Sequence, residues 1–217
     1  MPNVMRPGGP ARLKAAALEF AGVLVEDGLR ETLRQLAERN RQHADVLYKL
    51  AQQMLEETGY LVGGCTHVEF WQALQRVLPL RGRPSEFSDM VVLNYALRPR
   101  VVASVRIWRN AGLRAVLLCD NTDWLDRFEA RHKIFQEFDG VFNSFHMHKT
   151  KRDPAVYEEV AAKLQLQPSE ILAIDASADA LGVARKVGYQ TLLFGNPDRF
   201  MTAFEEVLGR NAGKAGV

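Results

Sequence analysis

Acidic side chains, one amide and one lysine stand where buried strands of this sequence would end. Glu19, Asp120 and Asp175 each close a short apolar run. Asn121 adjoins the second acid, and Lys151 follows another apolar run at a short distance. Carboxylates can act as nucleophiles or general bases, and their oxygens can hold a divalent cation. Because a lysine beside them adds a positive charge, we expect a polar centre in which acids and a lysine converge.

These residues can meet only if the apolar runs form one parallel sheet. Five runs have the length and composition of buried strands, and helical patterns separate the later ones. The five runs are residues 15–20, 114–119, 140–143, 171–175 and 191–194. Ligands of open parallel sheets bind beyond the carboxyl ends of the strands, which would gather the polar residues. The predicted fold class is therefore α/β, with a Rossmann-like core of five parallel strands.

The stretch between the first and second strands shows only helical periodicity. Leucines recur at helical spacing between Gly28 and Gly59, which we interpret as one long helix. Thr66 can cap a following helix, and a further helix is predicted over residues 85–97. We therefore predict that an all-helical domain is inserted into the α/β core.

The domain boundaries follow from this change in periodicity. The α/β core is predicted to consist of residues 1–26 and 97–217, and the helical insertion of residues 27–96. The insertion is too long for a simple crossover connection, and it is long enough for a small helical bundle.

Four segments, taken in order, resemble the four motifs of the haloacid dehalogenase (HAD) superfamily. They are Glu19–Leu24, Leu117–Thr122, Lys151–Pro154 and Asp175–Ser177. The resemblance covers about residues 15–200, and the helical insertion lies where this superfamily carries its cap domain. It implies a hydrolase fold with the helical cap type of the phosphatases and 2-haloacid dehalogenases.

The resemblance also implies a role for each polar residue. Glu19 stands where the superfamily has its nucleophilic Asp, and Lys151 stands where a lysine balances the phosphoryl charge. Asp120 takes the place of a phosphate-binding Ser or Thr, with Asn121 beside it as a further ligand-binding residue. Ala21 replaces the Asp that acts as general acid and base. Loss of such a group typically costs about 10²–10⁴-fold in rate.

Magnesium is a candidate cofactor on the same resemblance. Asp175 stands where an acid of the fourth motif holds the metal, and Ala176 replaces the second acid. Mg²⁺ prefers oxygen ligands in octahedral geometry, which Glu19, Asp175 and the carbonyl of Ala21 could supply together with water. The metal-free 2-haloacid dehalogenases lack similar acids, so the sequence leaves magnesium binding open.

Three functional hypotheses follow. The one favoured by the sequence is an inactive or strongly impaired phosphatase relative that binds a ligand or a partner, because Ala21, Ala176 and Asp120 all depart from the motifs. The alternative is a functional hydrolase with altered chemistry, in which Glu19 is nucleophile or base and Lys151 holds the anion. The third is an assembly protein, for instance a homodimer, that uses the cap as its interface.

Composition bears on the remaining classes of partner. The net charge of +2, without a basic stripe interleaved with aromatic residues, argues against nucleic acid. No apolar stretch approaches the ~20 residues of a membrane span, and residues 1–14 have no apolar core of a secretory signal. We therefore expect a cytoplasmic protein that meets a small anionic ligand or a protein partner.

Overall fold

A five-stranded parallel sheet forms the core of this computed structural model, which describes residues 11–195, 200, 202, 205, 206 and 209. The strands are β1 (Ala15–Leu18), β2 (Arg114–Cys119), β3 (Gly140–Asn143), β4 (Ile171–Asp175) and β5 (Gln190–Leu193). They are arranged in the order β3-β2-β1-β4-β5, and every neighbouring pair is parallel. The predicted fold class is confirmed. β1 ends two residues before its predicted end, which leaves Glu19 just beyond the strand.

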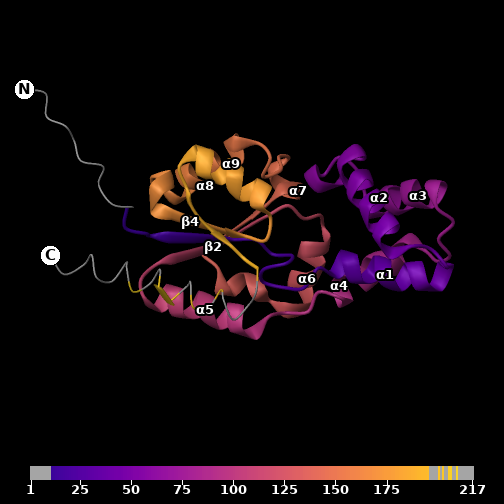
Figure 1. The fold of residues 1–217 in the computed structure, drawn as a ribbon, viewed down its shortest axis with the longest axis horizontal. Helices are drawn as coiled ribbons and strands as arrows, with labels where there is room; N and C mark the ends of the chain where they lie inside the picture. The colour runs from indigo at the N-terminus through magenta and orange to yellow at the C-terminus, as the bar shows by residue number, and fades with distance from the viewer. Residues whose placement is uncertain (1–10, 196–199, 201, 203–204, 207–208, 210–217) are drawn as a thin grey trace, which may run out of the picture.

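Helices cover both faces of the sheet, because successive side chains of each strand point to opposite faces. Ala16 and Leu18 of β1 belong to the apolar cluster that includes Trp108 and Phe128. Ala15 and Ala17 join the cluster on the other face, which includes residues of two later helices. The helices of the core are α5 (Pro99–Asn110), α6 (Trp124–His132), α7 (Ser144–Met147), α8 (Pro154–Leu164) and α9 (Ala178–Val187). Figure 1 shows α8 and α9 on one side of the sheet and α5 on the other.

The helical insertion between β1 and β2 is also confirmed, with a correction to its first helix. Its helices are α1 (Gly28–Asn40), α2 (Ala44–Glu57), α3 (His67–Val77) and α4 (Pro84–Leu93). The single long helix predicted between Gly28 and Gly59 is wrong, because Arg41 adopts a left-handed conformation with φ of 55°. Its backbone N–H then binds the carbonyls of Ala37 and Glu38 and ends α1. We call this insertion the cap.

The helix predicted after Thr66 is present as α3. The Thr66 hydroxyl accepts a hydrogen bond from the Glu69 backbone N–H, and the Glu69 carboxylate accepts one from the Thr66 backbone N–H. This reciprocal capping box satisfies donors that the helix itself leaves free. The last predicted cap helix is shorter than expected, since α4 ends at Leu93.

The cap joins the core through two crossing segments of chain. Val25 and Leu97 form an antiparallel bridge, supported by the hydrogen bond from the Glu26 N–H to the Ala96 carbonyl, which is 2.9 Å long. The boundaries at residues 27 and 96 remain a prediction, and they lie directly beside this bridge. In Figure 1, α1, α2 and α3 stand together at one end of the molecule.

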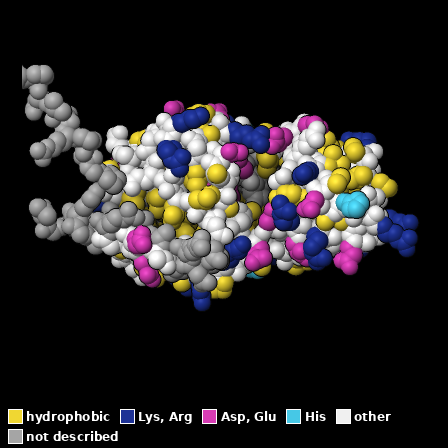
Figure 2. Space-filling view, in the orientation of Figure 1, with side chains coloured by type: hydrophobic (Ala, Val, Ile, Leu, Met, Phe, Trp, Pro, Cys, Tyr) yellow, Lys and Arg dark blue, Asp and Glu magenta, His cyan; other side chains and the backbone are white. Residues whose placement is uncertain are grey.

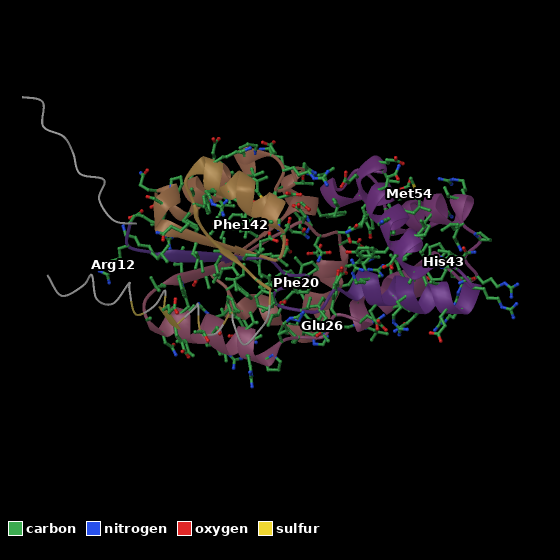
Figure 3. All side chains as sticks on the ribbon, in the orientation of Figure 1. Arg12, Phe20, Glu26, His43, Met54 and Phe142 are labelled. Carbon is green, nitrogen blue, oxygen red and sulfur yellow. The ribbon has the colours of Figure 1, made fainter. Side chains whose placement is uncertain are left out.

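Aromatic side chains pack the cap onto the core. Trp124 at the start of α6 lies against Tyr60, Phe70 and Trp71 of the cap, with ring centroids 5.4–6.0 Å apart. One apolar cluster therefore continues from the sheet into the cap, and Figure 3 shows Phe20 at the junction between the two. The cap is thereby fixed over the carboxyl edge of the sheet.

Charged side chains of both signs lie on the face of the molecule that Figure 2 presents. Figure 2 shows basic and acidic side chains interspersed on the visible face of the described residues. Among the helices of the described part of the chain, none has both the length and the hydropathy that a membrane crossing requires.

Candidate active site

The acids predicted at strand ends come together at the carboxyl edge of the sheet. Glu19 follows β1, Asp120 follows β2, and Asp175 is the last residue of β4. Because β1 stands between β2 and β4, the three acids come from adjacent strands. Lys151 lies between α7 and α8, and its side chain reaches the same edge.

The ammonium group of Lys151 forms the centre of this site. Its Nζ donates one hydrogen bond to Oε2 of Glu19 and one to Oδ2 of Asp175, and both contacts are ion pairs. The exposed fractions are only 5% for Lys151, 7% for Glu19 and 5% for Asp175. Since an unpaired buried charge is costly, these pairs tie the loop after α7 to β1 and β4.

Backbone amides hold the other oxygens of the two acids. The Phe20 N–H donates to Oε1 of Glu19 over 2.7 Å, and the Ser177 N–H donates to Oδ1 of Asp175 over 2.7 Å. Each carboxylate thus has one oxygen on the lysine and one on the chain that follows its own strand. Both side chains are fixed in position.

Asp120 positions the backbone of the lysine. Its two carboxylate oxygens accept the Lys151 backbone N–H at 2.9 and 3.2 Å. Burial raises the pKa of Asp120, and the positive charge of Lys151 opposes that rise. Asp120 therefore holds the loop that carries Lys151, and its predicted role as a ligand-binding residue stays a prediction.

The electrostatics of the cluster favour a protonation change near neutral pH. Burial raises the pKa of Glu19 to about 7, with Asp175 and Asp120 adding to the rise and Lys151 opposing it. Burial alone would lower the pKa of Lys151, but the surrounding carboxylates raise it well above its usual value. The lysine therefore stays charged while Glu19 can exchange a proton.

Asn121 lies in the wall of the site with unused hydrogen-bonding capacity. Its Oδ1 accepts the Tyr95 hydroxyl at 3.2 Å and the Thr122 N–H at 2.8 Å. Its Nδ2 is buried and has no hydrogen-bond partner among the described residues, and the same holds for Nε1 of Trp124. Neither Trp124 nor Tyr95 belongs to a strand-end motif, so the sequence motifs give no signal that these residues lie in the site.

A cavity of about 660 Å³ opens beside these residues. The core supplies Glu19, Lys151 and Asp175 to its wall, and the cap supplies residues that include Arg30 and Glu56. This volume is in the range of small-molecule sites. The cap therefore forms one side of the space that a ligand would occupy.

An ion pair joins the two sides of this cavity. Arg152, next to the central lysine, pairs with Glu56 of α2, and the two shortest contacts are each 2.7 Å. Both side chains line the cavity and are substantially exposed to solvent. The sequence gives no sign of this pair, since Glu56 and Arg152 are distant along the chain.

Ala21 and Ala176, which replace acids of the first and fourth motifs, line the cavity as well. A Cβ at Gly22, where φ is +87°, would lie 3.5 Å from the Cβ of Ala176, so Ala176 adjoins the turn that carries Ala21.

Asp27 also lines this cavity, but its carboxylate accepts hydrogen bonds from the Arg30 N–H, which caps α1, and from the Tyr48 hydroxyl. It is therefore committed to structural contacts.

Comparison with known proteins assigns the family. The model of the haloacid dehalogenase-like hydrolases matches residues 13–188. The chain belongs to this family. The match includes all four motif segments and the whole cap, so the resemblance seen in the sequence is confirmed.

A curated relative and two solved structures illustrate the similarity. Bifunctional epoxide hydrolase 2 of Rattus norvegicus is 25% identical over 91% of this chain and 39% of its own length. The chain thus spans about two fifths of that relative. A HAD family enzyme from Bacteroides thetaiotaomicron, in complex with magnesium and inorganic phosphate, has a TM-score of 0.66 at 15% identity, over 84% of this chain and 94% of its own. The second structure is L-2-haloacid dehalogenase from Xanthobacter autotrophicus with chloropropionic acid covalently bound, which has a TM-score of 0.63 at 18% identity. That match covers 82% of this chain and 76% of the dehalogenase chain.

The residues of this chain do not fit a magnesium ion as they stand. Mg²⁺ requires near-octahedral oxygen ligation. The two acids that could hold the ion already share the buried ammonium of Lys151, and a second acid of the fourth motif is missing at Ala176. In the described part of the chain, no group of three or more His, Cys, Asp or Glu side chains could hold a metal ion. The magnesium in the structure of the relative is a property of that protein.

Proposed function

We propose that this HAD family protein is a hydrolase of a small anionic substrate, with Glu19 and Lys151 at the reacting centre. This is the alternative hypothesis of the sequence analysis. The observation that carries it is the buried contact between Glu19 and Lys151 in the wall of the cavity. A carboxyl with a pKa of about 7 is suited to act as a general base at neutral pH.

In the proposed reaction, the Glu19 carboxylate removes a proton from a water molecule. The water oxygen attacks the substrate, and the leaving group departs with the electrons of the broken bond. The proton then passes from Glu19 to the leaving group or to solvent. Lys151 remains an ammonium ion throughout and stabilises the negative charge that develops beside it.

A direct attack by Glu19 would instead form a covalent ester with the substrate. With 2-chloropropionate as the substrate, for which the intermediate is a carboxylic ester, single turnover in ¹⁸O-labelled water separates the two routes. Water attack places the label in the product, whereas hydrolysis of an ester at its carbonyl carbon leaves label in Glu19. The pKa of Glu19 favours the first route, because a pKa near the operating pH suits a general base.

The second candidate is the impaired relative that binds a ligand without turning it over. Ala21 supports it, since no side chain capable of proton transfer stands at that position of the motif. In this reading the cavity and its lysine retain affinity for an anion, and the chemistry is lost.

The test is hydrolysis of an aryl phosphate and of 2-chloropropionate by the purified chain, with Glu19→Gln and Glu158→Gln beside it. Glu158 is exposed on α8 and serves as the matched control. We expect turnover by the wild type and by Glu158→Gln, and a loss of about 10²–10⁴-fold in Glu19→Gln. Equal background rates in wild type and Glu19→Gln with both substrates would favour the second candidate.

A further inference from the structure

We propose that the Lys151 ammonium is the resident cation of this site, so that the protein neither binds nor requires a divalent metal there. The proposal concerns the charge balance of the site, and it stands whether or not the proposed hydrolysis is correct. It starts from the mismatch between the residues present and the needs of Mg²⁺.

The first step is that the candidate metal ligands are already occupied. One oxygen of Glu19 and one of Asp175 bind the same ammonium group, and the second oxygen of each binds a backbone N–H. A metal ion bound to the same two acids would bring its positive charge beside the buried ammonium of Lys151. Repulsion between the two cations opposes metal binding, and an ammonium that moved away would lose both of its buried partners.

The second step is that Lys151 is held at both ends. Its backbone N–H is bound by the two oxygens of Asp120, and its side chain is buried between β1 and β4. An exposed lysine could turn aside for a metal at little cost. A buried lysine can turn aside only by breaking both of its ion pairs and moving its ammonium through the packed wall of the site.

The third step is the shortage of further ligands. The positions that could complete a metal site carry the methyl groups of Ala21 and Ala176. Glu56 is paired with Arg152, and Asp179, although exposed at the cavity, joins no group of three or more metal-ligating side chains in the described residues. A carboxylate added at Ala176 should therefore allow the site to bind Mg²⁺.

The experiment titrates Mg²⁺ into the full chain, with binding measured by isothermal titration calorimetry and by the shift in Tm against KCl of matched ionic strength. Ala176→Asp adds an acid at an exposed position of the cavity wall. Lys151→Met removes the ammonium and keeps the length of the side chain. We expect no saturable binding to wild type, and a Mg²⁺-dependent rise in Tm for at least one of the two variants.

Two outcomes would overturn the proposal. One is saturable Mg²⁺ binding to wild type that Asp175→Asn or Asp179→Asn removes. The other is a failure of both variants to gain any response to Mg²⁺. If Lys151→Met does not fold unaided, its refolding yield with and without Mg²⁺ replaces the Tm measurement. Turnover is not a readout, so a protein with no hydrolase activity and no Mg²⁺ binding would refute the proposed function alone.

Discussion

Lys151 shows how one residue can couple chemistry to stability. Its ammonium satisfies two buried carboxylates, and those carboxylates are what keep the lysine charged. A buried ion pair adds little when compared with an apolar pair, but removing one partner leaves the other charge unpaired in a region of low dielectric. The site and the fold therefore depend on the same contact.

We expect Lys151→Met to lower the free energy of unfolding by about 3–5 kcal/mol, the usual cost of breaking a buried ion pair from one side. Lys149→Met is the matched control, because Lys149 makes a partly exposed pair with Glu159 at 3.4 Å. Such pairs contribute about 0–1 kcal/mol. Urea denaturation at neutral pH measures both, and equal effects of the two changes would contradict the assigned role of Lys151.

The raised pKa of Glu19 predicts the pH dependence of turnover. A general base is active when deprotonated, so kcat/KM should rise with pH through about 7 and level off above it. The rise reflects loss of the proton that burial keeps on Glu19. A pH–rate profile from 5 to 9 measures it, and a rate that is flat across this range, or falls through 7, would rule out Glu19 as the base.

At the scale of the elements, close packing between cap helices depends on one glycine. A Cβ at Gly28, the first residue of α1, would overlap the carbonyl oxygen of Val91 in α4 and come within 2.8 Å of a ring carbon of Tyr95. Gly182 in α9 has no atom within 4 Å of the same position. An alanine at Gly28 therefore tests the effect of a packing clash, whereas an alanine at Gly182 tests the effect of helix propensity alone.

Gly28→Ala should destabilise the protein by about 1–3 kcal/mol, the range for overpacking a well-packed site. Gly182→Ala should be neutral or stabilising by roughly 0.5–1 kcal/mol, because alanine is the better helix former. Thermal unfolding of both variants tests the pair. A Gly28→Ala protein as stable as wild type would mean that α1 and α4 can separate freely.

The elements also show where sequence reasoning succeeds and where it fails. The strands were found because buried parallel strands are short, continuous apolar runs, a property local to each segment. The break at Arg41 was missed, since a non-glycine residue with φ of 55° has no reliable sequence signature. The helical spacing of leucines continues across the break and conceals it.

At the scale of the whole molecule, polar contacts attach the cap to the core around the cavity. Tyr60 donates a hydrogen bond to Asp123, the Ser144 hydroxyl donates to the Leu61 carbonyl over 2.7 Å, and His67 of α3 meets Arg127 of α6 at 3.1 Å. Because the Arg127 guanidinium can only donate, Nε2 of His67 must be the acceptor in that contact. The contact therefore requires a neutral imidazole.

This contact predicts a pH-dependent stability of the cap–core assembly. Burial and the charge of Arg127 lower the pKa of His67, while Asp123 and Asp89 oppose the shift. The unfolded chain then binds this proton more readily than the folded one. The stabilisation is complete above the ordinary imidazole pKa of about 6.5 and is lost as the pH falls below it.

Thermal unfolding between pH 5 and 8 should show this loss in wild type and a smaller one in His67→Gln. His43→Gln is the matched control, since His43 lies at the exposed end of the cap, as Figure 3 shows. A slope in His67→Gln as steep as in wild type would assign the pH dependence to other groups.

The α/β class, the family, the helical insertion and the strand ends that carry Glu19, Asp120 and Asp175 can all be predicted from the sequence. These follow from local periodicity and from motifs within short segments. The interactions between these residues are visible only in the folded protein. Lys151 reaches Glu19 across 132 positions of sequence and Asp175 across 24, and it is their shared burial that sets their protonation. Desolvation and ion pairing depend on the three-dimensional neighbours of a side chain, which no local pattern of residues records.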